Sequence, residues 1–254
     1  MGGFCSDELA KWSGGDWLGE KPRALVGGFI YDTRILKEGD VFVALKTKQR
    51  NGHDFLHDAK AKGAAAALVQ EDRECQGLPL LRVDDTLKGF HAIARNFRQT
   101  WQFPVVAITG SCGKTTTKDL LCHLLGGLPA AQGTQGNLNN LIGVPSTLLG
   151  VSPESCRFAI VEAGISEPGE MAQLAETIDP DRVIFTAIGP AHLERLGSVQ
   201  GVAKEKGLLS SGKRVERVYL AESCRSYQHF LNTERGVFVS DGEVHSSDWG
   251  YCAE

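Results

Sequence analysis

The chain has 254 residues, of which 42% are hydrophobic and 23% charged, and its formal net charge is −4. This length suits one large or two modest domains with a buried core, and the acidic balance argues against a nucleic-acid-binding protein, which normally has a basic face. No apolar run approaches the roughly 20 residues that cross a bilayer, so we expect no membrane partner.

The N-terminus and the cysteines favour a cytoplasmic protein. The start, MGGFCSDELAKW, lacks the basic and apolar regions of a secretory signal. Its fit to the Met-Gly-x-x-x-Ser acylation pattern has no supporting polybasic patch, and we attribute it to chance. The seven cysteines include no Cys-x-x-Cys pair, which favours free thiols in a reducing compartment. We expect a cytoplasmic monomer.

The first hundred residues alternate between predicted strands and helices. Short apolar runs predict buried strands, and apolar residues three or four positions apart predict helices. The predicted elements, in chain order, are a strand at 41–45, a helix at 53–63, and strands at 64–69 and 80–83. Asp84 and Asp85 are good N-cap residues for the next helix, whose apolar face recurs from Leu87 to Phe97.

Pro104 marks a predicted domain boundary, because a new apolar strand, PVVAIT, starts there. The alternation of strands and helices on both sides indicates an α/β protein. We therefore predict one α/β domain at residues 1–102 and a second at 103–254.

The second domain opens with VVAITGSCGKTTT (105–117), which is typical of a phosphate-binding loop. A strand leads into a glycine-rich turn and then into a helix, whose predicted buried stripe consists of Leu120, Leu121, Leu124 and Leu125. Free N–H groups of the turn and the positive end of the helix dipole favour an anion there. The candidate nucleotide-binding residues are Gly110, Ser111, Cys112, Gly113, Lys114, Thr115 and Thr116.

Two of these side chains have predicted roles. Lys114 would reach the outer phosphates of a nucleoside triphosphate, and the Thr115 hydroxyl would hold Mg²⁺. The usual loop has a glycine five positions before Gly113, where this chain has Ile108, and Gly110 closes a shorter loop instead. The alternative is an ordinary strand-to-helix turn, but the strand, the Gly-Lys-Thr sequence and the amphipathic helix together favour a nucleotide site.

The short loop and several other segments resemble one enzyme family. QGNLNNLIGVPSTLL (135–149), AIVEAGISEPGEM (159–171) and AHLERLGSVQGVAKEKG (191–207) follow Thr-Gly-x-x-Gly-Lys-Thr-Thr in the order typical of the Mur ligases, which add amino acids to the bacterial cell-wall precursor. The Gly-Asn-Leu-Asn-Asn form resembles the branch that joins D-alanyl-D-alanine to UDP-N-acetylmuramoyl-tripeptide. Residues 32–69 resemble that branch's UDP-binding module.

The resemblance implies an ATP-dependent, amide-forming ligase of peptidoglycan synthesis, on which cell shape and division depend. The implied fold is a small α/β UDP-binding domain (1–102) followed by an incomplete P-loop ATP-binding domain (103–254). The γ-phosphoryl group would move to a carboxylate, and an amine would then attack the acyl phosphate. Cations and N–H donors should dominate such a site because two anions must approach each other. The implied ligands are ATP, two Mg²⁺ ions, UDP-N-acetylmuramoyl-tripeptide and D-alanyl-D-alanine.

The resemblance also implies metal ligands. Thr115 and Glu162 suit a first Mg²⁺, since Glu162 ends a strand at the sheet edge where ligands collect, although it could be an ordinary solvated charge. His192 is implied as a ligand of a second Mg²⁺, although imidazole is an unusual Mg²⁺ ligand. Lys206 is implied as a carbamylated, metal-binding lysine, with Lys204 as the alternative. The implied catalytic residues are Lys114, His192 and Lys206.

Eight residues are implied to bind the UDP precursor. They are Thr33, Arg34, Asn51, Gly52, His53, Asn137, Asn139 and Asn140. Arg34 suits a diphosphate because its guanidinium offers paired donors. The Asn-rich segment could also be a simple turn.

Family members carry a third, Rossmann-like domain, for which the sequence up to Glu254 shows no match. We therefore expect this chain to ligate very slowly or not at all by itself. Two other classes stay open, namely a non-catalytic nucleotide-binding module derived from a ligase and a different P-loop enzyme such as a kinase. Within the ligases, the nearest alternative is the branch that adds the third amino acid.

Overall fold

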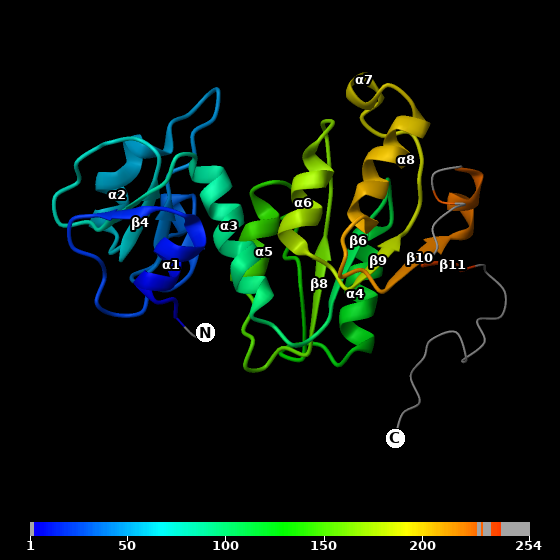
Figure 1. Cartoon of the computed structure of the whole chain (residues 1–254), viewed down its shortest axis with the longest axis horizontal. Helices are drawn as coiled ribbons and strands as arrows, with labels where there is room; N and C mark the ends of the chain where they lie inside the picture. The colour runs from blue at the N-terminus through cyan, green and yellow to red at the C-terminus, as the bar shows by residue number, and fades with distance from the viewer. Residues whose placement is uncertain (1–2, 228–229, 231–234, 240–254) are drawn as a thin grey trace. The chain divides into compact units, whose positions relative to one another are not determined.

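The computed structural model describes residues 3–227, 230 and 235–239 (Figure 1). They form two compact units. The first comprises the described residues up to 103 together with 134–157, and the second comprises 104–133 and the described residues from 158 onward. The sequence predicted a single boundary near residue 103. The structure instead places 134–157 in the first unit, where α5 (Gly143–Leu149) packs against α3 (Thr86–Gln99).

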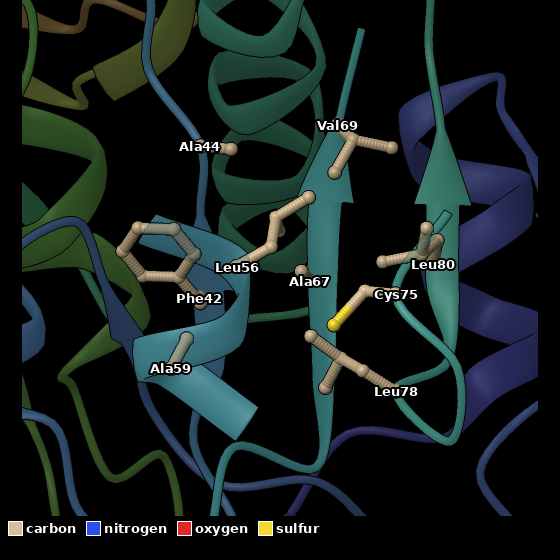
Figure 2. Packing of buried hydrophobic residues seen from close by; sticks show 9 residues of the cluster. All are labelled: Phe42, Ala44, Leu56, Ala59, Ala67, Val69, Cys75, Leu78 and Leu80. Carbon is tan, nitrogen blue, oxygen red and sulfur yellow. The ribbon is translucent and has the colours of Figure 1, made fainter. Parts of the chain in front are cut away.

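The first unit is built on a five-stranded sheet in the order β1-β5-β4-β3-β2. Strands β2 to β5 are parallel, and β1 is antiparallel to β5. The strands are β1 (Asp16–Leu18), β2 (Phe29–Ile30), β3 (Val41–Val43), β4 (Ala66–Val69) and β5 (Leu80–Arg82). The helices are α1 (Ser6–Ser13), α2 (Leu56–Ala61), α3 and α5. Figure 2 shows part of the core, in which Leu56 on α2 faces Ala67 on β4.

Local signals explain where these elements begin and end. The Asp85 carboxylate accepts a hydrogen bond from the Lys88 N–H and so caps α3 as predicted. The predicted helix at 53–63 is divided into a 3₁₀ turn, Gly52–Phe55, and the short α2. The chain leaves this helix through Gly63, whose φ of +84° is unfavourable for residues with a side chain.

The second unit contains a six-stranded parallel sheet in the order β11-β10-β9-β6-β8-β7. Its strands are β6 (Val105–Thr109), β7 (Ala131–Gly133), β8 (Phe158–Glu162), β9 (Arg182–Phe185), β10 (Arg217–Ala221) and β11 (Gly236–Val239). Its helices are α4 (Lys114–Leu124), α6 (Glu170–Ile178), α7 (Leu193–Leu196) and α8 (Val199–Gly207). The connections through α4 and α6 cross the sheet in opposite directions, so right-handed crossovers place these helices on opposite faces (Figure 1).

The predicted buried stripe of α4 is wrong for two of its four leucines. Leu120 and Leu124 are 58% and 71% exposed, whereas Leu121 and Leu125 pack against the sheet. The reason is that two neighbouring leucine pairs on the helix can each form an apolar stripe, and only one of them faces the strands. Lys118 is the one residue of α4 that is buried.

Two further observations concern the whole described part of the chain. None of its helices has both the length and the apolar character needed to cross a bilayer. All six of its cysteines are free thiols, and the seventh, Cys252, lies outside the described residues.

His91 on α3 gives the first unit a predicted acid sensitivity. The side chain is 5% exposed, and burial lowers its pKa to about 4 despite a backbone hydrogen bond with Leu141. As the pH falls, His91 in the unfolded chain, with its ordinary pKa, therefore binds a proton at a higher pH than His91 in the folded chain does. The free energy of unfolding should drop by about 3 kcal/mol between about pH 6.5 and pH 4 because of this group.

Urea unfolding at pH 7.5 and pH 4.5, followed by tryptophan fluorescence, measures this loss. Three of the four tryptophans, Trp12, Trp17 and Trp101, lie in the first unit and report on it. His91→Gln should show a smaller loss than the wild-type chain. An equal loss in the two proteins would show that His91 is not the cause.

Candidate active site

The phosphate loop connects β6 to α4 and depends on a close approach of the backbone at Gly110. A Cβ atom on Gly110 would lie 2.1 Å from Thr186 Oγ1 and 3.0 Å from the Ala187 carbonyl oxygen. Gly113 has a φ of +83° and directly precedes the first residue of α4. The two glycines therefore allow a tight turn that leads into the N-terminus of a helix, where free N–H groups attract anions.

The segment after β9 fastens this loop in place. The Ser111 N–H donates to the Ala187 carbonyl at 2.8 Å, and the Ser111 hydroxyl donates to the Gly189 carbonyl at 2.9 Å and accepts from its N–H at 3.0 Å. The Thr186 hydroxyl donates to the Cys112 carbonyl at 2.5 Å. The sequence did not reveal the role of Thr186, and its position directly after an apolar strand was the available signal.

Three predicted nucleotide-binding residues, Lys114, Thr115 and Thr116, form the first turn of α4. Lys114 Nζ donates to the Gly110 carbonyl at 2.9 Å, so its ammonium group lies over the loop. This is where an ammonium group can meet the outer phosphates of a nucleotide held by the loop.

Glu162 lies beside the phosphate loop because β8 pairs with β6, with Glu162 opposite Ile108. Its carboxylate is fully buried, and Oε2 accepts a hydrogen bond from the Thr115 hydroxyl at 3.2 Å. Lys118 Nζ lies 3.8 Å from Oε1. A hydroxyl and a carboxylate oxygen are the kind of ligand that Mg²⁺ prefers, so Thr115 and Glu162 fit a Mg²⁺ ion.

Lys206 is also buried in the second unit, with 3% of its surface exposed. Burial lowers its pKa to about 8, and the positive charge of Lys114 contributes to the shift. Glu205, the preceding residue, accepts hydrogen bonds from the Gly169 and Met171 N–H groups at 2.8 and 3.3 Å. These bonds tie α8, which carries Lys206, to the start of α6.

His192 is placed differently. It is exposed, has a φ of +51° and directly precedes the short helix α7. Within the described residues its ring makes no hydrogen bond or ion pair, and no group of three or more His, Cys, Asp or Glu side chains there is arranged to hold a metal. Thr115 and Glu162 are thus in direct contact, and within the described residues no hydrogen bond or ion pair joins the His192 ring to either of them.

In the first unit, Asn51 and His53 form hydrogen bonds with the segment that directly follows β4. The Gln70 N–H donates to His53 Nε2 at 2.9 Å, so the proton is on Nδ1, which donates to Asn51 Oδ1 at 2.7 Å. Burial lowers the pKa of His53, which favours this neutral form. Asn51 Nδ2 donates to the Glu71 carboxylate at 3.1 Å. Gly52 passes so close to the backbone that a Cβ atom would lie 2.7 Å from the Ala44 carbonyl carbon.

Arg34 and Thr33 lie in a short 3₁₀ turn of the same unit. The Arg34 side chain is 81% exposed and donates to the Asp32 carboxylate at 2.5 to 3.0 Å. This contact lowers the pKa of Asp32 to about 2. The Thr33 carbonyl accepts from Lys62 Nζ at 2.8 Å. The guanidinium is therefore oriented by Asp32 and open to solvent.

The Asn-rich segment belongs to the first unit and forms a compact turn before α5. Asn140 Oδ1 accepts from the Ile142 and Gly143 N–H groups at 3.1 and 2.9 Å. Asn137 is exposed and Asn139 is half-buried. Asn140 thus shapes the turn, which presents Asn137 to solvent.

Comparison with known proteins agrees with this architecture. Residues 108–237 match the model of the Mur ligase middle domain. The chain is 43% identical over 181 residues to the UDP-N-acetylmuramoyl-tripeptide–D-alanyl-D-alanine ligase of Escherichia coli, covering 71% of this chain and 40% of the relative. The Bacillus subtilis ligase of the same name is 36% identical over 233 residues, covering 86% of this chain and 50% of the relative.

Solved structures give the same result. A crystal structure of MurF from Acinetobacter baumannii superposes with a TM-score of 0.83 at 25% identity, covering 94% of this chain and 53% of that one. MurF ligase from Thermotoga maritima, in complex with ADP, has a TM-score of 0.70 at 28% identity, covering 85% and 51%. The chain spans about half the length of these relatives or less. With its phosphate loop, its buried Glu162 and a family match over more than half its residues, the chain belongs to the Mur ligase family.

Proposed function

We propose that this chain supplies the ATP site and the UDP-precursor site of a ligase that joins D-alanyl-D-alanine to UDP-N-acetylmuramoyl-tripeptide. The observation that carries the proposal is the contact between Thr115, at the start of α4, and the buried Glu162 beside the phosphate loop. The names of the relatives and the Gly-Asn-Leu-Asn-Asn segment support this branch of the family. The branch that adds the third amino acid remains the nearest alternative.

In the proposed reaction, the γ-phosphoryl group moves from ATP to a carboxylate of the precursor. The amine of D-alanyl-D-alanine then attacks the acyl carbon, phosphate leaves and an amide bond forms. Backbone N–H groups from Cys112 to Thr116 would hold the phosphates, since the Ser111 N–H is taken by the Ala187 carbonyl. Lys114 would offset the charge that two approaching anions bring together. Cys112 would contribute through its backbone N–H group, and its side chain is exposed.

Thr115 and Glu162 are the residues we propose for a first Mg²⁺, because both offer oxygen atoms beside the phosphate loop. When bound, Mg²⁺ would neutralise charge on the phosphates. For a second Mg²⁺ we propose His192 and a carbamylated Lys206. His192 is exposed next to the segment that fastens the loop, and Lys206 is buried near Lys114.

Carbamylation of Lys206 can be measured directly. The neutral Nζ atom attacks CO₂, a C–N bond forms and a proton is released, and burial of Lys206 favours the neutral amine that this needs. ¹³C-bicarbonate labelling followed by NMR should show one carbamate carbon in the wild-type chain. Lys206→Met should abolish the signal, and Lys204→Met, which removes an exposed lysine of the same helix, should keep it. A signal lost with Lys204 instead would assign the carbamate to the alternative lysine.

In the first unit we propose that Arg34 and Asn137 contact the UDP precursor, because both side chains are exposed. Thr33, Gly52, Asn139 and Asn140 would contribute through the shapes of their turns. Asn51 and His53 would hold the neighbouring loop, because both ring nitrogens of His53 are engaged within the unit. We further propose that the protein acts as a monomer in the cytoplasm.

Product analysis tests this function. The chain is incubated with ATP–Mg²⁺, UDP-N-acetylmuramoyl-tripeptide and D-alanyl-D-alanine, and the UDP-linked pentapeptide is measured by mass spectrometry. We expect pentapeptide to form only when all three substrates are present. Its rate of formation should lie far below the 1 to about 10³ per second of ordinary enzymes. Product from a UDP-dipeptide and a free amino acid would favour the alternative branch. Binding of ATP without binding of any UDP precursor would favour a nucleotide-binding module.

A further inference from the structure

Lys118 is an unusual lysine because it is buried. It lies on α4 three residues after Thr115 and therefore on the same face of the helix, and it is 7% exposed. Lysine side chains ordinarily extend to solvent. Here the stem passes over β7 at Gly133, where a Cβ atom would lie 3.3 Å from Lys118 Cδ. The missing side chain at Gly133 thus makes room for the lysine.

The buried ammonium group faces the carboxylate proposed to hold Mg²⁺. Lys118 Nζ lies 3.8 Å from Glu162 Oε1, and Thr115 Oγ1 donates to Glu162 Oε2 at 3.2 Å. Two side chains on one face of α4 therefore lie next to the two oxygens of one buried carboxylate. The Lys118 ammonium group is near Oε1, and the Thr115 hydroxyl is bonded to Oε2. Lys118 Nζ also lies 2.8 Å from the carboxylate of Asp119, whose side chain is 66% exposed.

We propose that Lys118 is a positioning residue that acts as the resident counter-ion of Glu162. Its ammonium group lies beside Oε1, leaves Oε2 beside Thr115 for the metal, and already supplies positive charge that a divalent cation would bring. A cation that enters the nucleotide-free site is repelled by Lys118, because like charges at short range in a buried site repel strongly. The phosphates of ATP add the negative charge that offsets this repulsion.

The consequence is that the metal binds with the nucleotide and only weakly without it. Lys118 in this way prevents the nucleotide-free site from retaining a divalent cation. This inference rests on the proposed function, since it takes Thr115 and Glu162 as metal ligands, but it makes a separate prediction about the nucleotide-free chain.

The test is titration of the chain with Mn²⁺, which shares the oxygen ligands of Mg²⁺ and can be followed by electron paramagnetic resonance. Without nucleotide, Lys118→Met should bind Mn²⁺ about 10-fold more tightly than the wild type, because a repelling charge is removed. Lys118→Arg keeps the charge and should behave as the wild type. Lys213→Met, which removes an exposed lysine of the same unit, is the matched control and should also leave Mn²⁺ affinity unchanged.

Two additional measurements make the result decisive. The double variant Lys118→Met/Glu162→Gln should lose the gain in Mn²⁺ affinity if Glu162 is the ligand, and thermal melts establish that each variant is folded. Should Lys118→Met not fold, Lys118→Gln serves in its place. A folded variant that gains no nucleotide-free Mn²⁺ affinity, while the wild type binds Mn²⁺ with a non-hydrolysable ATP analogue, overturns only the inference. Absence of Mn²⁺ binding in the wild type even with the analogue overturns the proposed metal-dependent nucleotide site as well.

Discussion

Replacement of Lys114 by methionine is expected to lower the affinity of the chain for ATP–Mg²⁺ by about 100-fold. Lys114 Nζ lies over the phosphate loop, 2.9 Å from the Gly110 carbonyl oxygen. Its positive charge is close enough to Lys206 to help lower the pKa of Lys206. An ion pair at about 4 Å contributes about 4 kcal/mol at an effective dielectric constant of about 20, part of which is offset by desolvation. Methionine keeps most of the apolar stem and removes the ammonium group, with its charge and its hydrogen bond to Gly110.

Calorimetric titration with ATP–Mg²⁺ measures this effect. The backbone N–H groups of the loop and the helix N-terminus remain in the variant and should retain weak binding. Lys213→Met is the matched control for loss of one positive charge and should bind as the wild type. If Lys114→Met binds ATP–Mg²⁺ within about threefold of the wild type, which is under 0.7 kcal/mol, Lys114 does not contact the phosphates.

The second large effect is expected for Gly143→Ala in the first unit. An alanine Cβ at this position would lie 2.3 Å from the carbonyl carbon of Leu138 and 2.4 Å from its Cα atom. Both atoms belong to the backbone, so the Asn-rich turn itself must move. We expect affinity for UDP-N-acetylmuramoyl-tripeptide to fall at least about 10-fold and the free energy of unfolding to fall by roughly 1–3 kcal/mol.

The matched control is Gly212→Ala, where the nearest atom to an added Cβ would be Val215 Cγ2 at 3.6 Å, an ordinary contact. Precursor titrations and urea unfolding of both variants separate the two effects. Asn137→Ala, at an exposed position in the same turn, should weaken precursor binding without loss of stability. Unchanged precursor affinity in both Gly143→Ala and Asn137→Ala would remove this turn from the proposed site.

Much of the fold follows from local sequence signals. Apolar runs and the Asp85 cap predict β4, β5 and α3 closely. Local signals could not show which face of a helix packs against a sheet, or which unit a segment joins. The exposed Leu120 and Leu124 on α4 and the packing of 134–157 on the first unit both depend on contacts between residues far apart in the chain.

The candidate site also contains residues that the sequence predicts and residues that it does not. The position of Glu162 beside the phosphate loop was predictable, because parallel strands carry ligand-binding residues at their carboxyl ends. Lys118 and Thr186 were not found from the sequence, since a lysine within a helix and a threonine after a strand are ordinary there. Their roles depend on Gly133 and Gly110, whose missing side chains allow the close approach.

The proposed function requires that one chain carries both an ATP site and a site for the UDP precursor. Calorimetric titration with UDP-N-acetylmuramoyl-tripeptide, with UDP alone and with ATP–Mg²⁺ tests it most directly. We predict that the tripeptide precursor binds at least about 10-fold more tightly than UDP, a difference of 1.4 kcal/mol, and that ATP–Mg²⁺ binds as well. Binding of ATP–Mg²⁺ with no binding of either UDP compound would show that the first unit does not bind the UDP precursor.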